Sequence, residues 1–257
     1  SEHRPEDEDL LAYALHSVEA LNARYPILNG GDAEAEPARR FILLHRRRLW
    51  NPGQNRWMGW ERKRGKLNEL NRFLRGSADT TFFPVCADED VARILRPTRY
   101  VITLDADTIL PPGAARRLVG TLAHPLNRAM FNDAGRVIAG YTVLQPRMEV
   151  HPSSVGRSWF TRVYAGQNGL DLYTHAVSDT YQDLFGEGSY VGKGIYDVDS
   201  FERATHGRIP ENRLLSHDLL EGILGRAGLV TDITMVEDHP PSYFSTSRRQ
   251  HRWIRGD

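Results

Sequence analysis

The sequence predicts an α/β fold with a mixed, mostly parallel sheet and helices on both faces. Continuous apolar runs of strand length alternate along the chain with segments in which leucine and alanine recur at helical spacing. Residues 100–104 form such a run, and the absence of polar alternation in it is typical of a strand covered on both faces. In such sheets ligands bind at the carboxyl ends of strands, and this run ends at Asp105.

The other expected elements can be placed in order. An amphipathic helix is expected over residues 5–24, where early acidic residues oppose the helix dipole, and a polar linker over 29–37 follows it. Further helices are expected at 66–74, at 88–96, after Pro111-Pro112 and at 219–224. Further strands are expected at 41–44, 137–144 and 229–236.

Composition excludes several classes of protein. A chain of 257 residues, 40% of them apolar, can bury the core of a single domain. Its 33 basic and 33 acidic residues balance, so no overall field favours a nucleic-acid partner. Cys86 is the single cysteine, which excludes a disulfide framework. No stretch reaches the roughly 18 apolar residues of a membrane-spanning helix.

The strongest candidate site is the motif Asp105-Ala106-Asp107, directly after the 100–104 run. Two carboxylates at positions i and i+2, where a strand becomes a loop, can converge on one divalent cation. Mg²⁺ or Mn²⁺ prefers such hard oxygen ligands and keeps positions open for phosphate oxygens. The motif therefore favours a site that stabilises a departing diphosphate, although two acidic residues in a solvated loop, without any such role, would show the same sequence pattern.

Three further motifs suit the same chemistry. Gly65-Lys66 is expected at the start of a helix, whose amino end favours phosphate. Asp218 is expected in the first turn of a helix, either as a general base or as a residue that only compensates the helix dipole. Arg249, Arg252 and Trp253 would share one helix face, where arginines suit a diphosphate and the ring suits a sugar. An ordinary basic surface helix also fits that last pattern.

Two other interpretations of the chain stay open. An apolar run followed by Asp-x-Asp and a threonine, here Thr108, also resembles the nucleophile strand of haloacid-dehalogenase-like phosphatases, in which Asp105 would attack phosphorus and Asp107 would act as general acid. That strand is usually the first of its domain, and Glu237-Asp238 is the candidate for the later acidic pair. The second interpretation is a non-catalytic carbohydrate-binding domain. Gly192-Lys193-Gly194 is set aside, because its spacing does not fit a P-loop.

Taken in order, the motifs resemble those of processive inverting glycosyltransferases of the cellulose-synthase type, and more closely the glycosyltransferase region of bacterial cyclic β-1,2-glucan synthases. The likeness covers most of the chain from residue 39 onward, through segments 57–71, 101–127, 181–201 and 211–257. It implies a GT-A-type (Rossmann-like) fold in a single glycosyltransferase domain over 1–257. The chain departs from that fold in beginning with a helix, with its first expected strand only at residue 41, so the first strand of the fold is expected to be lacking. The resemblance also implies a fragment of a larger protein of the bacterial inner membrane, with this domain on the cytoplasmic side and the remaining domains and membrane helices as partners.

The same resemblance implies a donor, an acceptor and roles for the acidic residues. The donor would be UDP-glucose, and the acceptor would be a growing β-1,2-glucan. Asp105 and Asp107 would hold Mg²⁺ or Mn²⁺ together with the diphosphate, and Lys66 would lie near the phosphates. Asp218 would be the catalytic base, where cellulose-synthase relatives carry the Asp of Thr-Glu-Asp.

The carboxyl-terminal motif matches the family pattern only in part. Arg252 and Trp253 correspond to the end of its Gln-x-x-Arg-Trp motif. Arg249 stands at the position of the glutamine, and Gln250 is offset from it by one residue. The resemblance therefore implies donor contacts for Arg252 and Trp253, and leaves Arg249 or Gln250 as the substitute for the missing glutamine.

Overall fold

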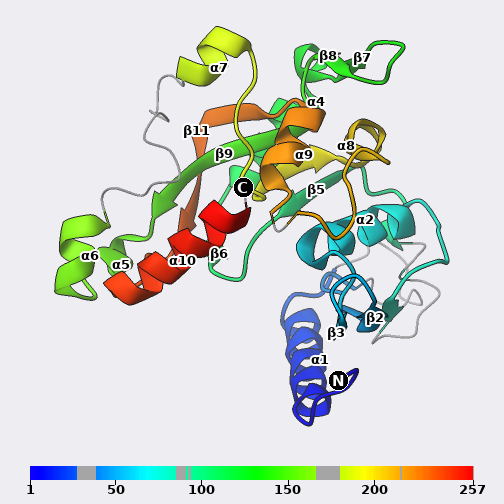
Figure 1. Cartoon of the computed structure of the whole chain (residues 1–257), viewed down its shortest axis with the longest axis vertical. Coiled ribbons are helices and arrows are strands. Elements are labelled where there is room, and N and C mark those ends of the chain that lie inside the picture. The colour runs from blue at the N-terminus through cyan, green and yellow to red at the C-terminus, as the bar shows by residue number, and fades with distance from the viewer. Residues whose placement is uncertain (28–38, 85–90, 92–93, 166–179, 215, 257) are drawn as a thin grey trace. The chain divides into compact units, whose positions relative to one another are not determined.

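The computed structural model describes residues 1–27, 39–84, 91, 94–165, 180–214 and 216–256. The chain divides into two compact units, Ser1–Thr98 and Arg99–Asp257, and most of their elements are labelled in Figure 1. Each unit has strands and helices of its own. The prediction of a single transferase domain over 1–257 stays a prediction.

The first unit combines helices with two small antiparallel sheets. Helix α1 spans Asp7–Arg24, as predicted, with three acidic residues in its first turn, and helix α2 spans Arg62–Leu74. The strand pairs are β1 (Leu44–Arg46) with β4 (Phe82–Pro84) and β2 (Leu49–Asn51) with β3 (Arg56–Met58). The strand expected at 41–44 is thus displaced toward the basic residues that follow it. The helix expected at 88–96 falls largely outside the described residues.

Helix α2 begins four residues before the predicted start at Lys66. The chain enters it through two non-glycine residues with positive φ, Glu61 at 48° and Arg62 at 51°. Gly65 allows this entry, because a Cβ there would lie 1.9 Å from the carbonyl oxygen of Trp60. Lys66 is therefore the fifth residue of α2, and its N–H is not one of the four that a helix start leaves free. The prediction that Lys66 opens the helix is therefore wrong.

The second unit is built on a five-stranded sheet in the order β5-β10-β9-β11-β6. Its strands are β5 (Tyr100–Thr103), β6 (Thr108–Ile109), β9 (Val143–Val150), β10 (Gly194–Asp197) and β11 (Gly228–Glu237). Among these strands β9 and β11 are parallel, and the other three neighbouring pairs are antiparallel. The predicted α/β class with a mixed sheet is confirmed, but the predicted excess of parallel pairs is wrong. An apolar run indicates that a strand is buried, whereas its direction depends on the connections between strands.

Helices cover both faces of this sheet. On one face, helix α4 (Ala114–Ala123) packs Leu118 into a core with Leu144 of β9, Ile195 of β10 and Met235 of β11. Successive side chains of a strand point to opposite faces, so Tyr196 faces the other way, and its ring lies 4.7 Å from that of Phe201 in helix α8 (Val198–Thr205). Helices α9 (Asp218–Gly225) and α10 (Tyr243–Gly256) lie in front of the sheet in Figure 1, and α4 lies behind it.

The remaining elements of the second unit are short helices and a small hairpin outside the five-stranded sheet. They are the 3₁₀ helix η1 (Pro125–Asn127), the hairpin of β7 (Met130–Phe131) and β8 (Val137–Ala139), and the short helices α5 (Pro152–Val155), α6 (Trp159–Tyr164) and α7 (Thr180–Phe185). The strand predicted at 137–144 is divided between β8 and β9. The chain turns at Gly140, whose φ is +66° and whose missing Cβ would lie 2.0 Å from the Arg128 carbonyl oxygen. The predictions for 219–224 and 229–236 are confirmed by α9 and β11.

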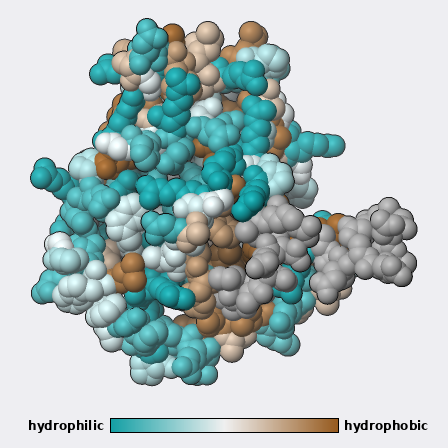
Figure 2. Space-filling view, turned by 90° about the vertical axis from the view of Figure 1, so that its right-hand side faces the viewer, coloured by the Kyte–Doolittle hydropathy of each residue, from teal (hydrophilic) through white to brown (hydrophobic). Residues whose placement is uncertain are grey.

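The described helices include none that is long and apolar enough to cross a bilayer. Hydrophilic side chains cover much of the face shown in Figure 2, and apolar residues form smaller patches between them. This surface agrees with a composition in which 26% of the residues are charged.

Candidate active site

Three carboxylates meet where β5 and β11 end and β6 begins. The loop from β5 to β6 carries Asp105 and Asp107, and Glu237 is the last residue of β11. Glu237 pairs with Thr108 across the β6–β11 ladder, and the Thr108 hydroxyl donates a 3.3 Å hydrogen bond to the carboxylate of Glu237. The same hydroxyl oxygen accepts the backbone N–H of Asp105 at 3.3 Å. Carboxylate oxygens of all three acids lie within 4.8 Å of one another.

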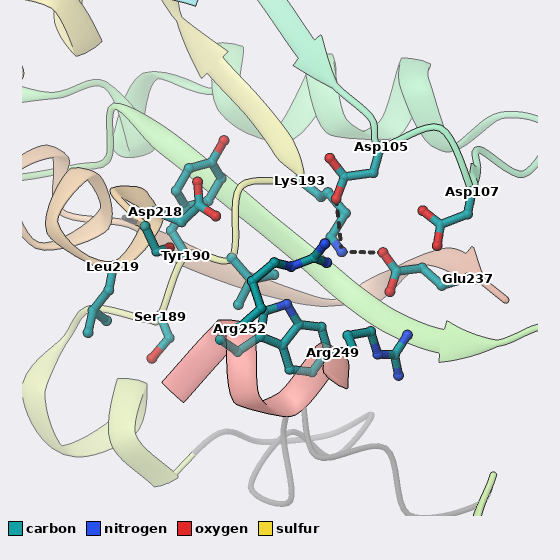
Figure 3. A pocket seen from close by; sticks show the side chains of 13 residues that line it. Asp105, Asp107, Ser189, Tyr190, Lys193, Asp218, Leu219, Glu237, Arg249 and Arg252 are labelled. Carbon is teal, nitrogen blue, oxygen red and sulfur yellow. Dashed lines mark ion pairs between the residues drawn. The ribbon is translucent and has the colours of Figure 1, made fainter. Parts of the chain in front are cut away.

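A lysine from the turn before β10 lies among these acids. The ammonium nitrogen of Lys193 is 3.4 Å from Asp105 Oδ2 and forms a second ion pair with Glu237. The side chains of Lys193 and Glu237 are only 7% and 8% exposed, whereas that of Asp105 is 40% exposed. Figure 3 shows the lysine between the two carboxylates. The sequence analysis gave Lys193 no role, because the glycine-rich stretch around it was rejected as a P-loop and otherwise counted only as part of the family resemblance of segment 181–201.

The acids and the lysine line one end of a cavity of about 480 Å³ within the second unit. Its walls come from the β5–β6 loop, the turn before β10, the start of α9, the end of β11 and helix α10. The lining residues are Asp105, Asp107, Ser189, Tyr190, Val191, Lys193, Ser216, Asp218, Leu219, Glu237, Arg249, Arg252 and Trp253. The structure therefore brings Asp218 into one cavity with Asp105 and Asp107, although Asp218 lies far from that pair in the sequence.

Asp218 is the first residue of α9 and lines the cavity. Its carboxylate lies against the backbone of Gly192, where a Cβ would approach Asp218 Oδ1 to 2.6 Å. Gly192 also has a φ of +81°, which other residues rarely adopt. The turn before β10 therefore leaves space for the Asp218 carboxylate at one residue and presents a lysine to the other acids at the next.

Tyr190 lies beside Asp218 and is fully protonated at neutral pH. Burial raises the pKa of the Tyr190 phenol well above its usual range, and the nearby negative charges of Glu221 and Asp218 add to the effect. A 3.2 Å hydrogen bond joins its hydroxyl to that of Thr103 at the end of β5. The phenol is thus a neutral neighbour of Asp218, and the carboxylate is the better proton acceptor of the two.

Helix α10 contributes Arg249, Arg252 and Trp253 to the cavity, as their spacing predicts. The guanidinium carbon of Arg249 lies 4.7 Å from the centroid of the Trp253 ring. Burial lowers the pKa of Arg249, and the negative charges of Glu237 and Asp107 oppose that shift. Gln250 is exposed and does not line the cavity, whereas Arg249 does, and the replacement of the family's glutamine by Gln250 stays a prediction. One residue along a helix is a turn of about 100°, which points Gln250 away.

The cavity has two chemically different ends (Figure 3). Asp105, Asp107 and Glu237 gather at one end, Asp218 lies at the other, and Arg252 projects between them. Three hard oxygen ligands so close together fit Mg²⁺ or Mn²⁺ and leave further coordination positions for phosphate oxygens. Lys66 belongs to the first unit, on α2, and its assignment to the phosphates stays a prediction.

The chain matches a bacterial relative along its whole length. The chain is 48% identical, over 259 aligned positions and 100% of its own length, to the cyclic beta-(1,2)-glucan synthase NdvB of Rhizobium meliloti (strain 1021). The chain spans about 9% of the length of that relative. No protein-family model matches the chain.

Proposed function

Because the chain corresponds along its whole length to a segment of a cyclic β-(1,2)-glucan synthase, we propose that it is the glucose-transferring part of such an enzyme. In this proposal the chain transfers glucose from UDP-glucose to a growing β-1,2-glucan with inversion at the anomeric carbon. The observation that supports it most is the single cavity in which Asp218 faces the acid cluster and the α10 arginines. A carboxylate base and a diphosphate-binding end are the two parts that one displacement requires.

Asp218 is the base in this proposal. Its carboxylate takes the proton of the 2-hydroxyl on the terminal glucose of the acceptor. The freed oxygen forms a bond to the anomeric carbon of the donor, and the bond from that carbon to the diphosphate breaks. The electron pair of the broken bond leaves with UDP. A single displacement of this kind inverts the configuration of the anomeric carbon.

The acid cluster and helix α10 bind the donor in this proposal. Asp105 and Asp107 hold a divalent cation, which when bound neutralises charge on the diphosphate. Arg252 donates to the departing UDP, since a guanidinium matches the geometry of phosphate oxygens. The Trp253 ring offers an apolar surface against which a sugar ring can pack. Lys193 and Arg249 add positive charge beside the carboxylates.

The rest of the longer protein belongs to the same proposal. The chain spans about 9% of the relative, so the acceptor chain, ring closure and processivity would involve other domains. A position on the cytoplasmic side of the bacterial inner membrane, next to membrane helices of the same protein, follows from the resemblance to processive transferases.

The phosphohydrolase and the binding-domain interpretations are not favoured. The phosphohydrolase needs a paired acid after a later strand, and the structure separates Glu237 from Asp238. Glu237 lines the cavity, whereas Asp238 lies outside it and pairs with Arg157 at 3.0 Å. Beryllofluoride trapping on Asp105 would support the phosphohydrolase interpretation. Glucan binding that changes neither on removal of metal nor on substitution of Asp218 would support the binding-domain interpretation.

The decisive experiment is Asp218→Asn in the full-length protein. We expect glucan synthesis from UDP-glucose to fall by about 10²–10⁴-fold, because an amide cannot accept the proton. Calorimetry should show that UDP-glucose binding is retained. The matched control is Asp232→Asn, which changes an exposed aspartate of β11 (67% side-chain exposure) and should keep normal synthesis. Near-normal polymerisation by Asp218→Asn would remove Asp218 from the role.

A further inference from the structure

The ammonium of Lys193 is placed where a divalent cation would also be attracted. It is paired with both Asp105 and Glu237, two of the three acids whose oxygens lie within 4.8 Å of one another. Two ligands on opposite sides of Mg²⁺ or Mn²⁺ are about 4.2 Å apart, since each bond is about 2.1 Å long. A cation that uses these oxygens would therefore lie close to the lysine nitrogen.

Such closeness is unfavourable for both positive charges. Two like charges about 4 Å apart repel strongly at the effective dielectric of a protein site. Four carboxylates line the cavity, those of Asp105, Asp107, Asp218 and Glu237, against three cationic side chains, Lys193, Arg249 and Arg252. The described lining therefore keeps an excess of negative charge, which attracts a further positive charge. The lysine and the divalent ion nevertheless compete for the same oxygens of Asp105 and Glu237.

The lysine side chain, and not its backbone, is the part that can move. The residue after Lys193, Gly194, is already paired with Thr103 of β5, and it packs so closely against β9 that a Cβ there would lie 2.1 Å from the Leu144 carbonyl oxygen. The backbone therefore has little room to shift. A lysine carries its charge on a flexible four-carbon stem, which can turn toward the cavity that this residue lines.

On this basis we propose that Lys193 is a built-in counter-cation of the acid cluster, that a divalent ion binds by exchange with its ammonium, and that Glu237 is the third protein ligand of that ion. The inference rests on the proposed function, in which Asp105 and Asp107 hold a divalent cation. It adds two residues that the sequence did not assign. It also explains the ion pairs of Lys193, because the lysine neutralises the acids and holds them together whenever the divalent ion is absent.

The first test is Mn²⁺ binding to the chain, measured by calorimetry or by the paramagnetic resonance of free Mn²⁺. Glu237→Gln should weaken binding by about tenfold or more, because it removes a charged ligand. Lys193→Met should tighten binding by about tenfold or more, because it removes the competing charge. Arg117→Met is the control, since it also removes one positive charge but breaks only the exposed pair with Asp232.

The outcomes distinguish the two proposals. A wild-type chain that binds no Mn²⁺ would overturn both the cation site and the exchange. A wild-type chain that binds Mn²⁺ as well as Lys193→Met does would overturn the exchange alone. A Glu237→Gln variant with unchanged affinity would remove Glu237 as a ligand.

A second measurement avoids any loss of folding in the variants. The chain has three lysines, Lys63, Lys66 and Lys193, so nitrogen-15 labelling of lysine side chains gives few signals. The Lys193 signal can be assigned by its absence in Lys193→Arg. Saturating Mg²⁺ should shift the Lys193 signal and leave the other two in place. A Lys193 signal that stays unmoved would overturn the exchange.

Discussion

Each unit of the chain contains a buried ion pair, and the two pairs differ in what surrounds them. In the first unit, Arg46 and Glu69 pair at 2.5 Å with side chains 8% and 9% exposed. Arg46 also donates to the carbonyls of Trp60 and Arg62, and Glu69 accepts both the N–H and the hydroxyl of Thr81. In the second unit, Lys193 and Glu237 are buried to the same extent.

The two ion pairs differ in the balance of charges around them and in whether they face a cavity. The Arg46–Glu69 pair matches one cation with one anion, and surrounding backbone groups complete its hydrogen bonds. The Lys193–Glu237 pair faces a cavity and shares its lysine with Asp105, beside Asp107. Burial of an ion pair is therefore no sign of a site by itself. An excess of one charge at the wall of a cavity is the feature that indicates ligand binding.

The largest expected effect tests the first pair. Glu69→Gln should lower the free energy of unfolding by about 3–5 kcal/mol, because it leaves the Arg46 charge buried and uncompensated. Glu237→Gln should cost clearly less, since Asp105 still compensates Lys193 and the cavity admits water. Denaturant unfolding followed by circular dichroism compares the two variants. Equal losses would show that the two pairs have the same structural role.

Gly192→Ala tests the wall that both ends of the cavity share. A methyl group at Gly192 would approach the Asp218 carboxylate to 2.6 Å and would have to adopt a φ of +81°. A misplacement of about 1 Å can cost about 10²-fold in rate, so synthesis by the full-length protein should fall by about that factor. Gly207→Ala is the control, since Gly207 has a φ of +69° but no atom within 4 Å of its missing Cβ. Equal losses in both variants would assign the effect to backbone strain.

Asp107→Ala tests the acid cluster with a smaller expected effect. UDP-glucose binding in the presence of Mn²⁺ should weaken by about tenfold or more, because the cation loses a ligand and the diphosphate loses its bridge. Binding in the presence of a chelator should change little. Titration calorimetry under the two conditions separates these outcomes, and an identical loss with and without Mn²⁺ would contradict the assignment of Asp107 to the cation.

Spacing along one element predicted the site well. The Asp105 and Asp107 pair, and the face formed by Arg249, Arg252 and Trp253, depend only on where a strand ends and on how a helix turns. The cavity therefore contains these residues as predicted. Their chemical roles stay predictions, because the position of a side chain does not show what it binds.

Contacts between elements that are distant in the sequence could not be predicted from the sequence. Lys193 reaches the acids because β10 lies between β5 and β9, and no local pattern gives that order. Glu237 was considered only with Asp238, although the ladder with Thr108 turns it toward Asp105. Lys66 was misplaced because α2 starts through two residues with positive φ, a conformation that the sequence Glu61-Arg62 does not predict.

The smallest expected effect concerns Asp238, the neighbour of Glu237 on the outside of the site. A hydrogen bond from the Ser154 hydroxyl at 2.8 Å, together with Arg157, lowers the pKa of the Asp238 carboxyl. A folded-state pKa below the unfolded value stabilises the fold above the unfolded pKa, and this contribution is lost as the pH falls through the folded pKa. Asp238→Asn should therefore slightly reduce stability at neutral pH and flatten the acid limb of the stability curve. Because the carboxyl is exposed, the change should stay small and should shrink further in high salt. Thermal melts between neutral and acidic pH would measure it, and altered Mn²⁺ binding by Asp238→Asn would contradict the separation of the two neighbouring acids.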